Sequence, residues 1–204
     1  MKVALGLKAH SGWAALVSIG RERGVLVVST RRRIDLVDDE WAKQPYHAAE
    51  SLELEPARRL VARGIAMTRR LAVAEMQAAV ADERRKQNTV GACAVLVGAP
   101  MPPWTVDEIL AVHVRMHKAE GVLFRDVLAY AATECALTLV TILEKQLHAQ
   151  AQKTLATPAA TLSKQIVALG ATVGAPWGKD QKDAALAALI ALEGKALGAG
   201  AALT

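Results

Sequence analysis

Three short apolar runs, separated by turn-like segments, open the chain. They cover residues 3–7, 13–19 and 24–36, and the third is rich in β-branched residues. Gly12 closes the first connecting segment, and Gly20 with a charged triplet follows the second run. Apolar runs of this length between glycine-containing turns are typical of strands joined as hairpins. The pattern therefore predicts an antiparallel meander of three strands.

The apolar period changes after Pro56. From there to about Lys86 apolar side chains recur at mainly helical spacing, and proline fits a first helical position. Residues 90–97 are continuously apolar and end at Gly98, as a strand buried on both faces would. The elements predicted further along are a helical stretch opened by a capping box at 105–108, an amphipathic helix at 120–135, a strand at 137–143, and helices at 159–169 and 180–192.

The predicted element order is β-β-β-α-β-α-β-α. Alternation after the meander requires crossover helices and a partly parallel sheet. We therefore predict an α/β protein with a mixed sheet and helices on both faces, forming one domain over 1–192. The last helix is apolar nearly all round and is expected to pack against the sheet. The small residues of 193–204 predict a flexible C-terminal tail.

Composition places the chain among globular proteins, with 52% hydrophobic and 22% charged residues. No apolar run approaches the roughly 18–20 residues of a membrane span. Lys8 and His10 interrupt the apolar start where a secretory signal would be continuous, so we expect a cytoplasmic protein. Cys93 and Cys135 lack metal-type spacing and lie in apolar segments, which predicts two buried, reduced thiols.

The balance of charge favours an anionic partner. The net charge is +5, and arginines concentrate in the predicted helix 56–86. Such a charge run forms either a solvated helix face or a contact surface for nucleic acid. Nucleic acid is accordingly the expected partner of this helix, no membrane contact is expected, and a homodimer is left open.

Two segments near opposite ends of the chain carry a family resemblance. Residues 4–14 run ALGLKAHSGWA, and residues 179–187 run KDQKDAALA. With the element order, they resemble the ribonuclease-H-like superfamily, and within it the Holliday-junction-resolvase branch. In that branch the first strand reads apolar-Gly-apolar-Asp-Pro-Gly, followed by Thr-Gly-Trp/Tyr-Ala, and the last helix brings one or two Asp residues to the metal site. The resemblance implies a ribonuclease-H-like fold.

This chain departs from the family pattern at the metal ligands. The family holds two divalent ions between carboxylates of the first strand, a middle strand and the last helix, and these ions activate water on a phosphodiester. Lys8 stands at the first-strand position, and the strand 90–97 has no acid, which leaves Asp180 and Asp183. A cation at Lys8 repels Mg²⁺ and pairs with the two Asp residues instead. The resemblance thus implies a nucleic-acid-binding relative without the standard two-metal nuclease activity.

The fold that the resemblance implies brings several polar residues to one end of the sheet. These are Lys8, His10, Ser11, Asp180 and Asp183. Trp177, just before the last helix, is predicted either to stack on a base or to plug the core. Arg125 is either a binding residue or half of a surface ion pair. No cofactor is assigned, and a divalent metal would use Asp180, Asp183 or His117.

The histidines suggest a second group of polar residues. His113, His117 and Glu120 share one face if their helix is continuous, although Gly121 could end it there. His47 and Glu50 repeat the His-x-x-Glu spacing. Imidazoles with carboxylates bind Zn²⁺, Mn²⁺ or Fe²⁺, catalyse acid–base steps, or simply satisfy one another, and all three hypotheses stay open. The alternative function is therefore an enzyme with rebuilt His/Asp chemistry, metal-assisted or not, on a phosphorylated or otherwise anionic small molecule.

Overall fold

A five-stranded mixed sheet forms the centre of the molecule, whose computed structural model describes residues 1–194. The strands are β1 (Lys2–His10), β2 (Trp13–Glu22), β3 (Val25–Asp35), β4 (Thr89–Val97) and β5 (Thr138–Leu143). Their order across the sheet is β3-β2-β1-β4-β5. β2 is antiparallel to both β1 and β3, while β4 is parallel to β1 and β5. The predicted three-stranded meander and the predicted mixed α/β sheet are confirmed.

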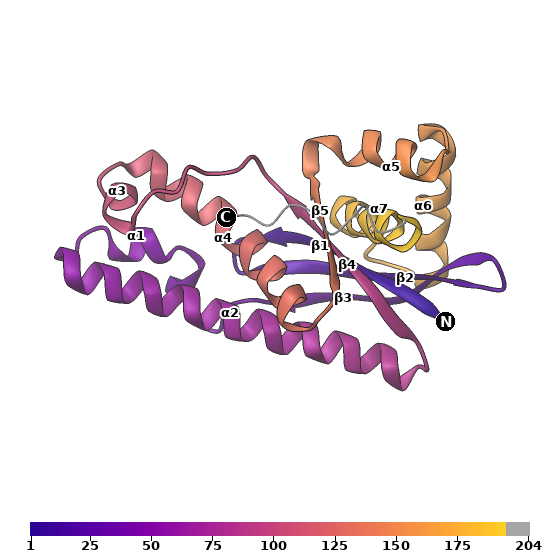
Figure 1. Cartoon of the computed structure of the whole chain (residues 1–204), viewed down its shortest axis with the longest axis horizontal. Helices are drawn as coiled ribbons and strands as arrows, with labels where there is room; N and C mark the ends of the chain where they lie inside the picture. Colours follow the sequence, from indigo (N-terminus) through magenta and orange to yellow (C-terminus); the bar gives the residue numbers. More distant parts are fainter. Residues whose placement is uncertain (195–204) are drawn as a thin grey trace.

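Helices cover both faces of this sheet, as predicted (Figure 1). The long helices α2 and α4 pack on one face, and α5, α6 and α7 pack on the other. The bounds are η1 (Glu40–Lys43), α1 (Pro45–Ala49), α2 (Leu54–Arg85), α3 (Val106–Leu110), α4 (His113–Glu134), η2 (Glu144–Gln146), α5 (Leu147–Leu155), α6 (Ala159–Val173) and α7 (Lys179–Glu193).

The helices differ from the predictions at several places. α4 begins at His113 rather than near residue 120, and Gly121 lies inside it instead of ending it. The Thr105 capping box does open a helix, but α3 ends at Leu110. Neither α1 nor α5 was predicted. α7 extends to Glu193, and residues 195–204 of the predicted tail lie outside the described part of the chain.

The alternation of β1 decides which of its side chains reach which helix layer. Leu5 and Leu7 are buried in the cluster formed with α2 and α4. Ala4 faces α7, and Gly6 comes so close that a Cβ atom there would overlap the backbone of Ala184. Lys8, two residues further on the same face, is therefore carried beneath the first turns of α7.

The two cysteines occupy different environments, so the prediction of two buried thiols holds for one of them. Cys93 on β4 is fully buried, and burial raises the pKa of its thiol to about 12. Cys135, at the end of α4, is half-buried, and both thiols are free.

Between residues 1 and 194, no helix has both the length and the apolar character needed to cross a bilayer.

The contact at Gly6 predicts a strongly destabilising substitution. Gly6→Ala should lower the free energy of unfolding by at least about 3 kcal/mol, because the added methyl meets helix backbone that cannot rotate away. The matched control is Gly121→Ala, inside α4 with open space around its Cβ position. That change should stabilise the protein by about 0.5–1 kcal/mol. Urea denaturation of both variants checks this, and equal effects would contradict the close packing of α7 on β1.

Candidate functional site

The ammonium of Lys8 lies among three carboxylates at the carboxyl end of β1. Its Nζ is 2.7 Å from Asp183 Oδ2, 3.0 Å from Glu144 Oε1 and 3.6 Å from Asp180 Oδ1. The Lys8 side chain is only 7% exposed. Lys179 Nζ also lies 2.7 Å from Asp183 Oδ2, one turn earlier on α7. We call these five residues the Lys8 cluster.

Further cationic and aromatic side chains border the Lys8 cluster. His10 Nε2 lies 3.1 Å from Asp180 Oδ2, and Arg125 Nη2 lies 3.5 Å from Glu144 Oε2. The His10 ring stacks on Trp13 with 4.3 Å between ring centroids, and the Arg33 guanidinium lies 4.3 Å from the same indole centroid. Beside them, a surface depression of about 430 Å³ lies at the ends of β4 and β5.

Opposite charges stabilise each other inside the cluster. Burial alone would lower the pKa of the Lys8 ammonium, but hydrogen bonds to Asp183 and Glu144 outweigh it and raise that pKa above its usual value. Burial would likewise raise the pKa of Asp183, yet hydrogen bonds from Lys179 and Lys8 hold it below its usual value. Lys8 and Asp183 are therefore both charged across the neutral pH range.

Some predicted site residues meet here and others do not. Lys8, His10, Asp180 and Asp183 lie together, whereas Ser11 is exposed in the turn between β1 and β2. The expectation that only two acids remain was wrong, because Glu144 supplies a third. One signal could have found it: Glu144 follows directly after the apolar run of β5, so it lies at the same sheet edge as the end of β1.

Trp177 packs against the core, which is one of the two roles predicted for it, and Arg125 forms an ion pair. The Trp177 indole N–H donates to the Ile166 carbonyl at 2.8 Å, and its ring packs against Gly170 of α6. This position matches the hydrophobic plug rather than a base-stacking platform. Arg125 pairs with Glu144 and donates to the Gly121 carbonyl at 2.7 Å, so its ion pair is not with its neighbour Asp126.

The residues of the Lys8 cluster do not fit the two divalent ions that the family resemblance implies. Hard divalent cations need several oxygen ligands around a central position. The Lys8 ammonium already lies at that position, within 3.6 Å of Asp180, Asp183 and Glu144. A divalent ion placed there would be repelled by the ammonium and would compete with it for the same carboxylates. The ammonium thus acts as a covalently attached cation for these carboxylates.

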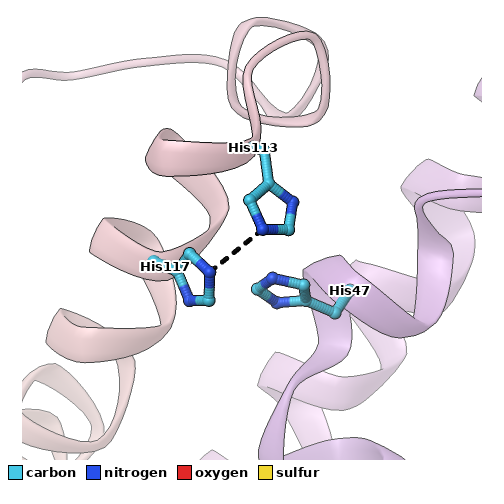
Figure 2. Close-up of side chains that lie close together, drawn as sticks. All are labelled: His47, His113 and His117. Atoms are coloured by element: carbon cyan, nitrogen blue, oxygen red, sulfur yellow. Dashed lines mark hydrogen bonds between the residues drawn. The ribbon is translucent and has the colours of Figure 1, made fainter.

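Three histidines form a second cluster on the other side of the sheet, which we call the histidine cluster. His47 comes from α1, and His113 and His117 come from adjacent turns of α4, with their rings turned toward one another (Figure 2). One nitrogen from each ring lies within 4.8 Å of the other two. His113 Nε2 and His117 Nε2 are 3.1 Å apart. Because α4 already begins at His113, His113 and His117 are about one helical turn apart and share a face.

Two carboxylates orient the histidine cluster from behind. Glu120 Oε2 lies 2.6 Å from His47 Nδ1, and its Oε1 accepts hydrogen bonds from the backbone N–H groups of Tyr46 and His47 at 3.1 Å. Burial, and then the charge of Glu120, raise the pKa of Tyr46. Glu50 Oε1 lies 3.3 Å from His113 Nδ1. Glu120 is buried and therefore fixes α1 on α4.

The two clusters are separate in space. In the described part of the chain, no hydrogen bond or ion pair joins the histidine cluster to the Lys8 cluster. The histidine cluster rests on the small core between α1, α2, α3 and α4, whereas the Lys8 cluster lies under α7. The two groups of polar residues therefore do not form one site.

A stripe of arginines runs along the outer face of α2. The spacings between Arg59, Arg63, Arg70 and Arg84 are close to whole helical turns, so the four lie opposite the buried side of the helix. All four are exposed. Arg70 lies 3.6 Å from Asp38, and the other three form no ion pair with any residue of 1–194. We call these four residues the basic stripe.

Comparison with known proteins gives likeness of structure only. No protein-family model matches the chain, and no curated protein matches it. Among solved structures it is similar to RuvC of Thermus thermophilus, with 13% identity, 92% of each chain covered and a TM-score of 0.46. It is also similar to T. thermophilus RuvC in complex with a Holliday junction substrate, with 13% identity, 93% of this chain and 92% of that chain covered, and a TM-score of 0.45.

The Lys8–Asp183 pair predicts a specific response to acid. A carboxylate whose folded pKa is lowered contributes stability that is present above its unfolded pKa of about 4 and is lost as the pH falls through the folded pKa. The free energy of unfolding of wild type, from urea curves, should therefore fall more steeply below about pH 4 than that of Lys8→Met/Asp183→Leu. Glu40→Gln, which removes an exposed carboxylate, should keep the wild-type profile. Identical profiles for the double variant and wild type would contradict the pairing.

Replacing the tethered cation by an acid should make the fold depend on metal. Lys8→Asp places four carboxylates together, so in chelator it should be destabilised by at least about 3 kcal/mol. Mn²⁺ should recover part of this loss, because the central position is then open to an oxygen-binding cation. Lys8→Met is the control, destabilised but unresponsive to Mn²⁺. Thermal melts with and without Mn²⁺ distinguish them, and a Lys8→Asp variant as stable as wild type in chelator would refute the role given to Lys8.

Proposed function

We propose that this protein binds nucleic acid through the basic stripe of α2 and does not cut it by two-metal chemistry. The observation that carries the proposal is the set of exposed arginines without carboxylate partners: Arg59, Arg63 and Arg84. An uncompensated row of guanidinium groups attracts a polyanion and releases its counterions on contact. Arg58 and Arg85 are excluded from this role because each pairs with a neighbouring carboxylate.

The shape of α2 supports a linear polyanion rather than a small anion. The helix has 32 residues and is therefore about 48 Å long. Small side chains, such as Ala62, Ala66 and Ala74, separate the exposed arginines. A phosphate backbone can approach such a face closely. A single phosphorylated metabolite would instead need cations converging on one point.

Aromatic side chains beside the stripe add a second type of contact. The guanidinium of Arg69 lies 4.9 Å from the Tyr130 ring centroid, and that of Arg63 lies 5.7 Å from the Trp41 ring centroid. Tyr130 is 39% exposed. An exposed ring next to an arginine, such as Tyr130, is suited to unpaired bases, which stack on aromatic faces with little sequence preference. Single-stranded or branched nucleic acid is therefore the proposed ligand class.

The absence of nuclease activity follows from the Lys8 cluster. Two-metal cleavage requires carboxylates that are free to hold divalent ions on both sides of the scissile phosphate. Asp183 is buried and already paired with both Lys8 and Lys179, and Glu144 is paired with Lys8 and Arg125. The proposed activity is consequently binding, because internal ion pairs already occupy these carboxylates.

Fluorescence anisotropy with labelled branched, duplex and single-stranded oligonucleotides tests the proposal. Binding should weaken steeply with salt, and Arg59→Gln/Arg63→Gln should reduce the slope of log K against log salt by roughly 1.4–1.8, at about 0.7–0.9 per lost phosphate contact. Lys153→Gln/Lys164→Gln, an equal charge change on the other face of the sheet, should leave the slope unchanged. Flat anisotropy for every oligonucleotide at low salt would end the proposal. Equal losses in both double variants would remove the basic stripe as the contact surface.

A further inference from the structure

The histidine cluster has the ligand set of a transition-metal site, and we infer that it binds one divalent ion of the zinc type. The ion would be held by the Nε2 atoms of His47, His113 and His117, with a fourth position open to water. This inference is independent of nucleic-acid binding, because none of the three histidines belongs to the basic stripe. It rests on four features of the cluster. Three ring nitrogens converge, carboxylates orient the rings, one buried ring nitrogen has no hydrogen-bond partner, and the site is open to solvent.

The convergent nitrogens follow from the hydrogen bonds on the far side of each ring. The Nδ1 atoms of His47 and His113 face Glu120 and Glu50, so Nε2 is the free nitrogen of both rings. His113 Nε2 and His117 Nε2 are 3.1 Å apart. Two nitrogens on a tetrahedral zinc ion, each at about 2.0–2.1 Å, lie about 3.3–3.4 Å from each other. The helical spacing of α4 thus already sets one edge of the tetrahedron.

His47 completes the site with a modest movement. The ligand atoms lie within 4.8 Å of one another, so the widest separation must shrink by about 1.4 Å to reach a tetrahedral edge. Rotation of a partly buried imidazole about its side-chain bonds covers that distance. His47 Nε2 is buried and has no hydrogen-bond partner between residues 1 and 194. A buried nitrogen without a partner is unfavourable, and coordination to a metal would satisfy it.

The carboxylates behind the rings are the outer partners that metal-bound histidines need. A ligating imidazole donates its second N–H to a carboxylate or carbonyl, which fixes the tautomer and makes the ligand more basic. Glu120 does this for His47 at 2.6 Å, and Glu50 does it for His113 at 3.3 Å. Glu120 is itself held by two backbone N–H groups, so its orientation is fixed before any ion arrives.

The chemistry of the ligands selects the class of ion. Three neutral imidazoles favour Zn²⁺, Co²⁺, Ni²⁺ or Cu²⁺ and disfavour Mg²⁺ and Ca²⁺, which prefer oxygen ligands. Three protein ligands leave one position for water, as in zinc sites that carry out chemistry, rather than a closed site of four. His113 and His117 are exposed, so an ion can enter directly from solvent.

Metal titration of the untagged, full-length protein tests the inference. After treatment with chelator, the protein should bind one equivalent of Zn²⁺ or Co²⁺ by calorimetry, and bound Co²⁺ should give the visible absorption of a tetrahedral site. At a free Zn²⁺ concentration of about 100 Kd, the Tm should rise by roughly 5–11 °C. Mg²⁺ should give no shift. The variants His113→Ala and His117→Ala should lose the equivalent, while His148→Ala, an exposed histidine on α5, should keep it.

A variant of the outer carboxylates separates a built site from incidental histidine binding. Glu50→Gln leaves all three rings in place and lies at an exposed pair, so folding should be intact by circular dichroism. It should weaken Zn²⁺ binding about 10- to 100-fold, because a neutral amide is a weaker acceptor than the carboxylate and makes the His113 imidazole less basic. Full binding in Glu50→Gln would contradict the orientation by Glu50. Absence of binding by wild type, or an undiminished equivalent in His117→Ala, would overturn the inference.

Discussion

The approach of α7 to β1 is the constraint on which the rest of the structure depends. At Gly6 the helix backbone touches the strand, and no side chain could stand between them. The next residue on that face of the strand is Lys8, which is therefore desolvated under α7. A buried ammonium needs an opposite charge with good geometry. Asp183, directly before Ala184 of that contact, supplies it at 2.7 Å.

This pairing fixes the charge balance at the ends of the parallel strands. The positive charges of Lys8, Lys179 and Arg125 lie against the negative charges of Asp180, Asp183 and Glu144. The group is close to neutral as a whole, so it has no excess negative charge with which to hold divalent ions. Exposed positive charge lies instead on the outer face of α2. The exposed positive charge of α2 and the neutralised Lys8 cluster thus lie on opposite faces of the same sheet.

The hydrophobic periodicity predicted the elements that have long apolar patterns. It did not predict the short or polar helices. The strands and the helices α2, α6 and α7 have long apolar patterns, and all were predicted to within a few residues. The start of α4 was missed because Val112 is its N-cap and provides no side-chain cap, so the sequence carries no start signal there. The short helix α1 and the polar helix α5 exist through tertiary packing that local propensity does not encode. The expected topology placed Lys8, Asp180 and Asp183 near one another. The position of Glu144 could not be predicted, because it depends on strand register. The separation of the histidines from this group could not be predicted either, because it depends on helix continuity.

The two clusters differ most in whether their polar groups are satisfied. In the Lys8 cluster each buried charge has an opposite partner, so the network is complete without any ligand and rigidifies the contact between α7 and the sheet. In the histidine cluster the carboxylates satisfy only the rear nitrogens, and the front nitrogens face one another across a short gap. Two imidazole nitrogens can share at most one proton, so the third ring cannot be satisfied by the other two. A complete network of ion pairs stabilises a fold. Converging imidazole nitrogens without full hydrogen-bond partners are instead suited to binding a ligand. The Lys8 cluster therefore anchors α7 on the sheet, and the metal site that we propose for the histidine cluster would lie between α1 and α4.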